Sequence, residues 1–318
     1  MSHFFTNFNV LDCLSMTRNR CFSFVCLLLG TLAACNTTPS EEQQGILTGK
    51  AKVLVDETIE PIIEDQVDVF QSSYTNAELT LVPLAENEVI HALLKDSAEI
   101  AVMARALTDE EMAFFKKKTI YPKTVRFATD AIALIRSRSD ADSVITADEV
   151  IQVMQGKEVP ALPSLVFDNA NSSTVAYFKK LAKIEELPSK GVYALKSNAD
   201  VLKYVTEHPQ SVGVLGINWI AQPTPELAPY IPKIRVLAVK NQEGKPGSDG
   251  YYKPSQSNLA LNLYPFTRSL YCINVQGKKA VGFGFSAFLY GERGQRLILK
   301  SGLLPDSIPP REIIIREQ

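Results

Sequence analysis

The order in which short apolar runs and helical patterns alternate constrains the fold of this chain more than any other feature. Strands are predicted at 51–55, 79–83, 99–104 and 125–135, the last one interrupted near Asp130. Helices are predicted between them, at 61–74, at 86–95 and after the capping-box sequence that begins at Thr108. This βαβαβ order predicts an α/β fold with a mainly parallel sheet, helices on its faces, and ligands at the carboxyl ends of the strands.

A second α/β region follows the first. Its predicted elements are helices near 147–155, 174–183 and 198–207, a strand at 211–215, and an exposed Gly/Pro-rich loop at 244–253. The chain then returns with a strand at 269–275 and helices near 280–300. Two α/β lobes suit a protein that closes on a solute held in a crevice between them. We therefore expect one lobe from 50–135 and 262–318, and a second from 136–261.

The N-terminal residues are typical of the signal of an exported lipoprotein. Arg18 and Arg20 precede an apolar run, 22–32, that has the length of a signal-peptide core and is too short to span a bilayer. The run ends at Leu-Ala-Ala-Cys, residues 32–35, which resembles a bacterial lipobox because small residues precede a cysteine whose thiol can carry a lipid. The alternative is an ordinary secretory signal in which Cys35 is incidental.

On the lipobox interpretation, residues 1–34 are a signal peptide and Cys35 carries the lipid, palmitate among its acyl chains. Residues 35–49 are polar and aperiodic, which predicts a flexible tether. Translation starts at Met1 or at Met16. The predicted location is the bacterial cell envelope, with the protein anchored to a membrane and facing the periplasm.

Composition excludes several classes of protein. A net charge of −2 argues against a nucleic-acid binder, which needs a basic face. Outside the signal, no apolar stretch of about 18 residues is long enough to span a membrane. Beyond Cys35 the chain has only Cys272, so no intrachain disulfide is predicted, and the apolar surroundings of Cys272 predict a small buried hydrophobe.

Motifs of enzyme active sites are also missing from the sequence after the signal. Only His91 and His208 remain, which leaves few candidates for a catalytic triad or a zinc site, and neither a G-x-S-x-G nor an H-E-x-x-H motif occurs. The acidic residues have no metal-binding spacing. We therefore expect a monomeric binding protein without a cofactor, and not an enzyme.

Several segments, in a shared order, resemble the phosphate-binding component of phosphate ABC importers, a type II periplasmic binding protein. They are 55–61 (VDETIEP), 100–107 (IAVMARAL), 128–133 (ATDAIA), 171–174 (NSST), 211–216 (SVGVLG), 263–271 (LYPFTRSLY) and 291–295 (GERGQ). The resemblance extends over nearly all of the chain after the signal. It implies two lobes, each a mainly parallel sheet flanked by helices. It also implies that phosphate or a related oxyanion binds between the lobes and is delivered to the permease of the importer.

The resemblance places ligand contacts in two loops that open helices. The contacts implied are Asp56, Glu57 and Thr58 in the first loop, and Asn171, Ser172, Ser173 and Thr174 in the second. Free backbone N–H groups and the positive end of the helix dipole suit such loops to anions. The same serines and threonines are equally common as plain helix N-caps.

Two charged residues complete the implied site. Arg105 ends a predicted strand and could hold an oxyanion with its planar guanidinium, or form a salt bridge with Glu99 or Glu110. Asp130 could accept the proton of a monohydrogen phosphate, or be a turn residue between strands. Arg268 lies in a matched segment and is predicted to be structural.

Acidic replacements in these loops leave the solute open. Asp56 and Glu57 stand where the family has serines, Met103-Ala104 stands where it usually has a serine hydroxyl, and Asp168 replaces a family arginine. Carboxylates facing the crevice would repel a phosphate dianion unless helix termini or Arg126, Arg136 or Arg268 compensate. Otherwise Asp168 pairs with Arg105, the acids point away, or the ligand is not phosphate. The alternative function is a sensor or adaptor lipoprotein of the same fold.

Overall fold

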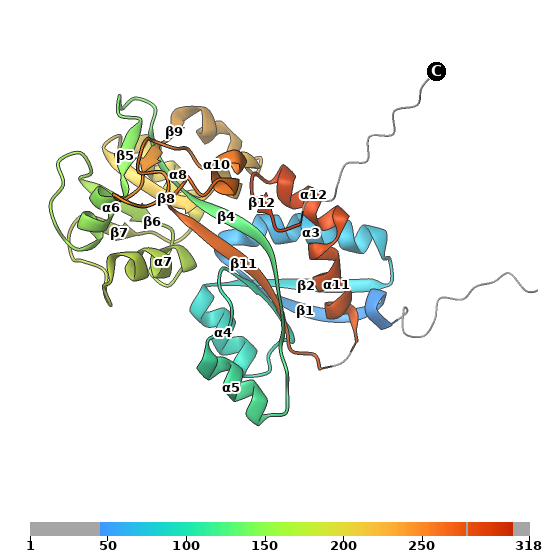
Figure 1. Cartoon of the computed structure of the whole chain (residues 1–318). Coiled ribbons are helices and arrows are strands. Elements are labelled where there is room, and N and C mark those ends of the chain that lie inside the picture. The colour runs from blue at the N-terminus through green and yellow to red at the C-terminus, as the bar shows by residue number, and fades with distance from the viewer. Residues whose placement is uncertain (1–44, 278, 308–318) are drawn as a thin grey trace, which may run out of the picture. The chain divides into compact units, whose positions relative to one another are not determined.

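The computed structural model describes residues 45–277 and 279–307 (Figure 1). The predicted signal peptide, the lipid-bearing Cys35 and most of the predicted tether lie outside the described residues. Of that tether, residues 45–47 are helical and Gly49 already begins the first strand. Among the described residues, no helix has both the length and the apolar character needed to cross a bilayer.

The first half of the sheet consists of parallel strands joined by helices. In chain order its elements are β1 (Gly49–Asp56), η1 (Glu57–Ile59), α3 (Glu60–Ser73), β2 (Ala77–Leu84), α4 (Glu86–Leu94), β3 (Ile100–Met103) and α5 (Asp109–Lys117). β1 pairs in parallel with both β2 and β3. Pro61 stands in the first turn of α3, and Thr108 forms the predicted capping box of α5 with Glu111.

The second half has the same construction. Its elements are β5 (Val144–Thr146), α6 (Ala147–Met154), β6 (Ser164–Phe167), α7 (Ser173–Ala182), β7 (Val192–Ala194), α8 (Asn198–Glu207), β8 (Ser211–Gly216), α9 (Asn218–Ala221), η2 (Ala228–Lys233), β9 (Ile234–Val236), β10 (Ala238–Lys240) and α10 (Gln256–Ala260). β6 pairs in parallel with β7 and β8, and β5 with β10 in a separate two-stranded sheet.

Two long antiparallel strands, β4 (Lys123–Ser137) and β11 (Thr267–Asn274), join the halves in the order β2-β1-β3-β11-β4-β8-β6-β7. Figure 1 shows them running between the group of β1 and β2 and the group of β6 and β8. β4 pairs with β11 up to Ala131 and with β8 from Ile132 onward. The C-terminal elements α11 (Val281–Tyr290), α12 (Glu292–Lys300) and β12 (Leu304–Pro305) follow β11.

The predicted α/β architecture is confirmed, with one correction. The strand predicted to break near Asp130 is continuous, because β4 pairs with β11 up to Ala131 and with β8 from Ile132 onward, and because Asp130 and Ala131 are buried. Cys272 is a free, fully buried thiol, as predicted, and lies 3.2 Å from the hydroxyl of Ser286. The carboxyl ends of β1 and β6 and the middle of β4 come together where the two halves meet.

Candidate functional site

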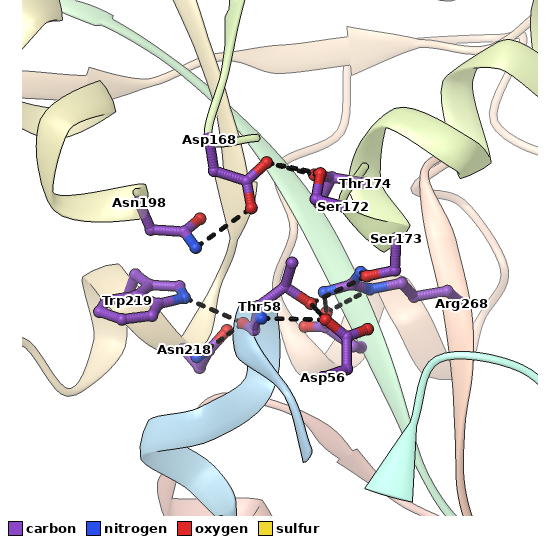
Figure 2. Close-up of polar contacts among 11 residues, drawn as sticks. Asp56, Thr58, Asp168, Ser172, Ser173, Thr174, Asn198, Asn218, Trp219 and Arg268 are labelled. Atoms are coloured by element: carbon purple, nitrogen blue, oxygen red, sulfur yellow. Dashed lines mark hydrogen bonds and ion pairs between the residues drawn. The ribbon is translucent and has the colours of Figure 1, made fainter. Parts of the chain in front are cut away.

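Polar side chains from both halves of the sheet gather, fully or almost fully buried, where the halves meet (Figure 2). We call this group the junction cluster. Its members are Asp56, Thr58, Asp130, Asp168, Ser172, Ser173, Thr174, Asn198, Asn218 and Arg268. They lie at the end of β1, in η1, in β4 and β11, directly after β6, and at the starts of α7, α8 and α9. Buried polar groups are costly unless they are paired, so their partners define the site.

Arg268 is the central cation of the junction cluster. Its Nε donates a hydrogen bond to Oδ2 of Asp130 over 2.8 Å, and its Nη2 lies 2.8 Å from the same oxygen. Its Nη1 donates to the hydroxyl of Ser173 over 2.6 Å. The guanidinium therefore ties β11 and β4 to the N-terminus of α7, as Figure 2 shows for Arg268 and Ser173.

The first loop meets the second directly. Oδ1 of Asp56 caps η1 by accepting from the backbone N–H of Thr58 over 3.0 Å and from its hydroxyl over 2.9 Å. The Thr58 hydroxyl in turn lies 3.0 Å from the Ser173 hydroxyl. On the other side, the indole N–H of Trp219 donates to the Thr58 carbonyl over 2.9 Å. The two loops that the sequence singled out are thus in contact.

Asp168 organises the start of α7. Its Oδ1 accepts from the hydroxyls of Ser172 and Thr174, over 2.7 and 2.8 Å, and its Oδ2 accepts from the side-chain amide of Asn198 over 3.3 Å. Ser172 also caps α7 through the N–H of Val175. The hydroxyls of Ser172 and Thr174 are therefore engaged with Asp168, which does not pair with Arg105.

The remaining predicted contacts lie around this cluster. Glu57 is half-buried and accepts from the side-chain amide of Asn169 over 2.9 Å, while Asn171 is exposed. Arg105 is bound by Glu111 through two hydrogen bonds of 2.8 and 2.9 Å and by Glu86 at 3.3 Å. Arg105 therefore forms salt bridges, as the alternative to an oxyanion contact supposed, but with Glu111 and Glu86 in place of Glu99 or Glu110.

The other two arginines that could have compensated the acids are engaged elsewhere. Arg126 pairs with Asp306, and Arg136 pairs with Asp140 and Asp142. Among the described residues, Arg268 is thus the cation that lies within the junction cluster. The predicted structural role of Arg268 agrees with its buried ion pair to Asp130, and its guanidinium also contacts Ser173 in the second predicted ligand-binding loop.

Electrostatics of the cluster are dominated by buried acids. Burial raises the pKa of Asp130, although Arg268 counteracts the rise, and burial also raises the pKa of Asp168 against the hydroxyls of Ser172 and Thr174. Asp56 is fully buried beside both. The cluster therefore holds excess negative charge, which protons or hydrogen-bond donors would stabilise.

Comparison with known protein families identifies the superfamily of the chain. Residues 38–293, most of the chain, match the family described as PBP superfamily domain. The chain belongs to this superfamily. Two curated relatives are phosphate-binding proteins PstS: one from Pseudomonas aeruginosa PAO1, 19% identical over 304 residues (88% of this chain, 90% of that protein), and one from Borreliella burgdorferi B31, 23% identical over 265 residues (78% and 86%).

A solved structure shows the same fold. It is that of a putative phosphate ABC transporter substrate-binding protein with bound phosphate from Clostridium perfringens, with a TM-score of 0.65 and 16% identity over 81% of this chain and all of that chain. The predicted resemblance and the type II periplasmic-binding-protein fold are confirmed.

Sequence reasoning gave no site role to Asn198, Asn218, Trp219 or Glu86, and it gave Arg268 only a structural or charge-compensating one. Arg268 carried a usable signal, because it shares one face of its strand with the apolar Leu270 and Cys272, and a buried arginine needs a partner. Asn198, Asn218 and Trp219 stand at helix starts with no local feature that marks them. Glu86 was assigned only to a helix, yet its carboxylate is nearly buried beside Arg105.

Replacing Glu86 with glutamine should stabilise the protein at alkaline pH. Burial, reinforced by Asp56, raises the pKa of Glu86 from 4.5 to about 7 despite Arg105. The folded state therefore retains a proton that the unfolded chain loses, so the wild type loses stability as pH rises from 4.5 to 7. Urea unfolding of Glu86→Gln at pH 8 should give a gain of about 2 to 3 kcal/mol.

The same substitution should have little effect at pH 4, where the carboxyl is protonated in both states. Glu78→Gln is the matched control, because that side chain is 58% exposed beside Lys50 and should change stability little at either pH. A loss of stability in Glu86→Gln at pH 8 would mean that the Arg105 ion pair outweighs the burial of Glu86.

Proposed function

We propose that this protein is the solute-binding receptor of an ABC importer, and that it captures phosphate or a related oxyanion between two lobes, 50–135 with 262–318 and 136–261. Membership of the superfamily and the names of the relatives support this role. The observation that carries it is the contact of Thr58 and Ser173, at helix starts in opposite halves, beside the buried guanidinium of Arg268.

The chemistry of this contact suits solute exchange. The hydroxyls of Thr58 and Ser173 satisfy one another at 3.0 Å, and each could instead donate to an oxyanion that parts them. The N-terminus of α7 adds the positive end of its dipole, and Arg268 adds a charge-assisted donor. Closure of the lobes on a solute would then replace a contact that already exists between the halves.

A lipid anchor would keep such a receptor near its permease. We propose that residues 1–34 are removed and that Cys35 carries the lipid, with the folded part facing the periplasm as a monomer. In a bacterial host, Cys35→Ser should shift the protein from the membrane fraction to the soluble fraction. Retention of Cys35→Ser in the membrane fraction would contradict lipidation at this residue.

The buried acidic residues of the junction cluster favour a second candidate function. Asp56 and Asp168 are buried in the cluster, where the resembling family has a serine and an arginine. A protein with this charge could bind a solute other than phosphate, or act as a sensor or adaptor that binds no transported solute.

Calorimetric titration of the purified protein with sodium phosphate at neutral pH separates these functions. The receptor function predicts heat of binding and a higher melting temperature at millimolar phosphate. No heat and no thermal shift under these conditions would exclude phosphate as the solute and favour the second candidate.

A further inference from the structure

The junction cluster contains more unused acceptors than unused donors. Four fully or almost fully buried oxygens accept no hydrogen bond: Oδ2 of Asp56, Oδ1 of Asp130, Oδ1 of Asn198 and Oδ1 of Asn218. One buried nitrogen, Nη2 of Arg268, makes an ion pair but no hydrogen bond. A ligand that satisfies this cluster must therefore chiefly donate hydrogen bonds.

The two carboxylates show the surplus most clearly. Asp56 uses Oδ1 to cap η1, a task that a serine could perform, and its Oδ2 serves no local purpose. Asp130 uses Oδ2 to hold Arg268, and its Oδ1 is left over. Both residues are fully buried, so each unused oxygen costs free energy until it meets a donor.

Charge leads to the same requirement. Several ionisable groups on the surrounding elements interact electrostatically with Asp56 or Asp130: Glu57, Glu86, Asp168, Tyr264 and Arg268. Two more lie one step further out, since Arg105 interacts with Glu86 and Tyr177 interacts with Arg268. Carboxylates outnumber guanidinium groups in this set. A dianion placed here would add two negative charges, with Arg268 as the cation of the cluster to balance them. Burial would strengthen the repulsion between the dianion and the carboxylates.

We infer that the junction cluster binds a solute that donates hydrogen bonds to it. The solute must bring at least two acidic or cationic protons, one to Oδ2 of Asp56 and one to Oδ1 of Asp130. The inference rests on the proposed function and narrows its solute. Dihydrogen phosphate meets the requirement, since two of its oxygens carry protons and two can accept from Arg268 and the Ser173 hydroxyl. Hydrogen phosphate has one proton too few, and sulfate has none at neutral pH. A guanidinium or ammonium group meets the same requirement without being an oxyanion.

Titration calorimetry at pH 6 and at pH 8 tests this requirement. Sodium phosphate should bind about sevenfold more weakly at pH 8, because only the dihydrogen fraction is competent and that fraction falls about sevenfold over this range. Sodium sulfate should give no heat at either pH. Asp56→Asn preserves the shape and the cap but presents an amide donor in place of Oδ2, so its phosphate affinity should change less than threefold between the two pH values.

Asp96→Asn is the matched control, because Asp96 is exposed beside Lys118 and has a φ of 57°, which asparagine also adopts. It should show the same pH dependence as the wild type. Equal phosphate affinity of the wild type at pH 6 and pH 8 would overturn the inference while leaving the proposed function intact.

Titration with methylguanidinium chloride under the same conditions distinguishes failure of the inference from failure of the proposed function. Heat with methylguanidinium but none with phosphate at either pH would support a donor-seeking site and overturn phosphate as the solute. No heat with either compound would overturn both the inference and the proposed function.

Discussion

Replacing Arg268 with methionine should lower the free energy of unfolding by about 3 to 5 kcal/mol at pH 7. Asp130 is fully buried, and its main charged partner is the guanidinium 2.8 Å away. Methionine fills much of the volume but leaves this carboxylate uncompensated and Ser173 without its donor. Urea unfolding followed by circular dichroism measures the loss.

The loss in Arg268→Met should shrink in acid, because burial raises the pKa of Asp130 and a protonated carboxyl no longer needs the cation. The double variant Asp130→Asn/Arg268→Met should recover part of the stability for the same reason. Arg296→Met serves as the control, since Arg296 is 71% exposed and its pair with Glu292 should contribute less than about 1 kcal/mol. A loss below about 1 kcal/mol in Arg268→Met would show that the pair does not hold the halves together.

Replacing Ser173 with aspartate should weaken phosphate binding at least about a hundredfold. The hydroxyl of Ser173 lies 2.6 Å from Nη1 of Arg268 and 3.0 Å from the hydroxyl of Thr58, where the proposed solute would sit. An aspartate there would take the guanidinium for itself and would repel an anion about 4 Å away by roughly 4 kcal/mol at a protein-like dielectric constant. Calorimetry with sodium phosphate at pH 6 measures the change.

Ser257→Asp gives the matched comparison, because Ser257 is an exposed serine in the first turn of α10. It places the same charge at a helix start outside the junction cluster and should leave the affinity unchanged. If Ser173→Asp remained folded and bound phosphate within threefold of the wild type, the solute would bind elsewhere.

Elements with local signals could be predicted from the sequence. The helix after Thr108 follows from a capping box, and α3 follows from Pro61 and a regular apolar stripe. The break expected in β4 was wrong because Asp130 was interpreted as a turn residue. The partner that allows an aspartate inside a buried strand, Arg268, lies 138 residues away in the sequence.

The candidate site likewise contains residues that a local sequence pattern predicts and contacts that no local pattern predicts. Asp56 and Ser172 could be found because they cap helices, and capping is a short-range pattern. The engagement of Asp168 by hydroxyls is also local, yet nothing in the sequence excluded a pair with Arg105. The direct contact between Thr58 and Ser173 depends on how β4 joins the halves, so no local pattern predicts it.

The most direct test of the solute site is a crystal structure of the protein grown with sodium phosphate at pH 6. The proposed function predicts a tetrahedral solute between the Thr58 and Ser173 hydroxyls, within hydrogen-bond distance of Nη2 of Arg268 and of the unused oxygens of Asp56 and Asp130. An unchanged direct contact between Thr58 and Ser173, with no phosphate bound in the junction cluster, would contradict it.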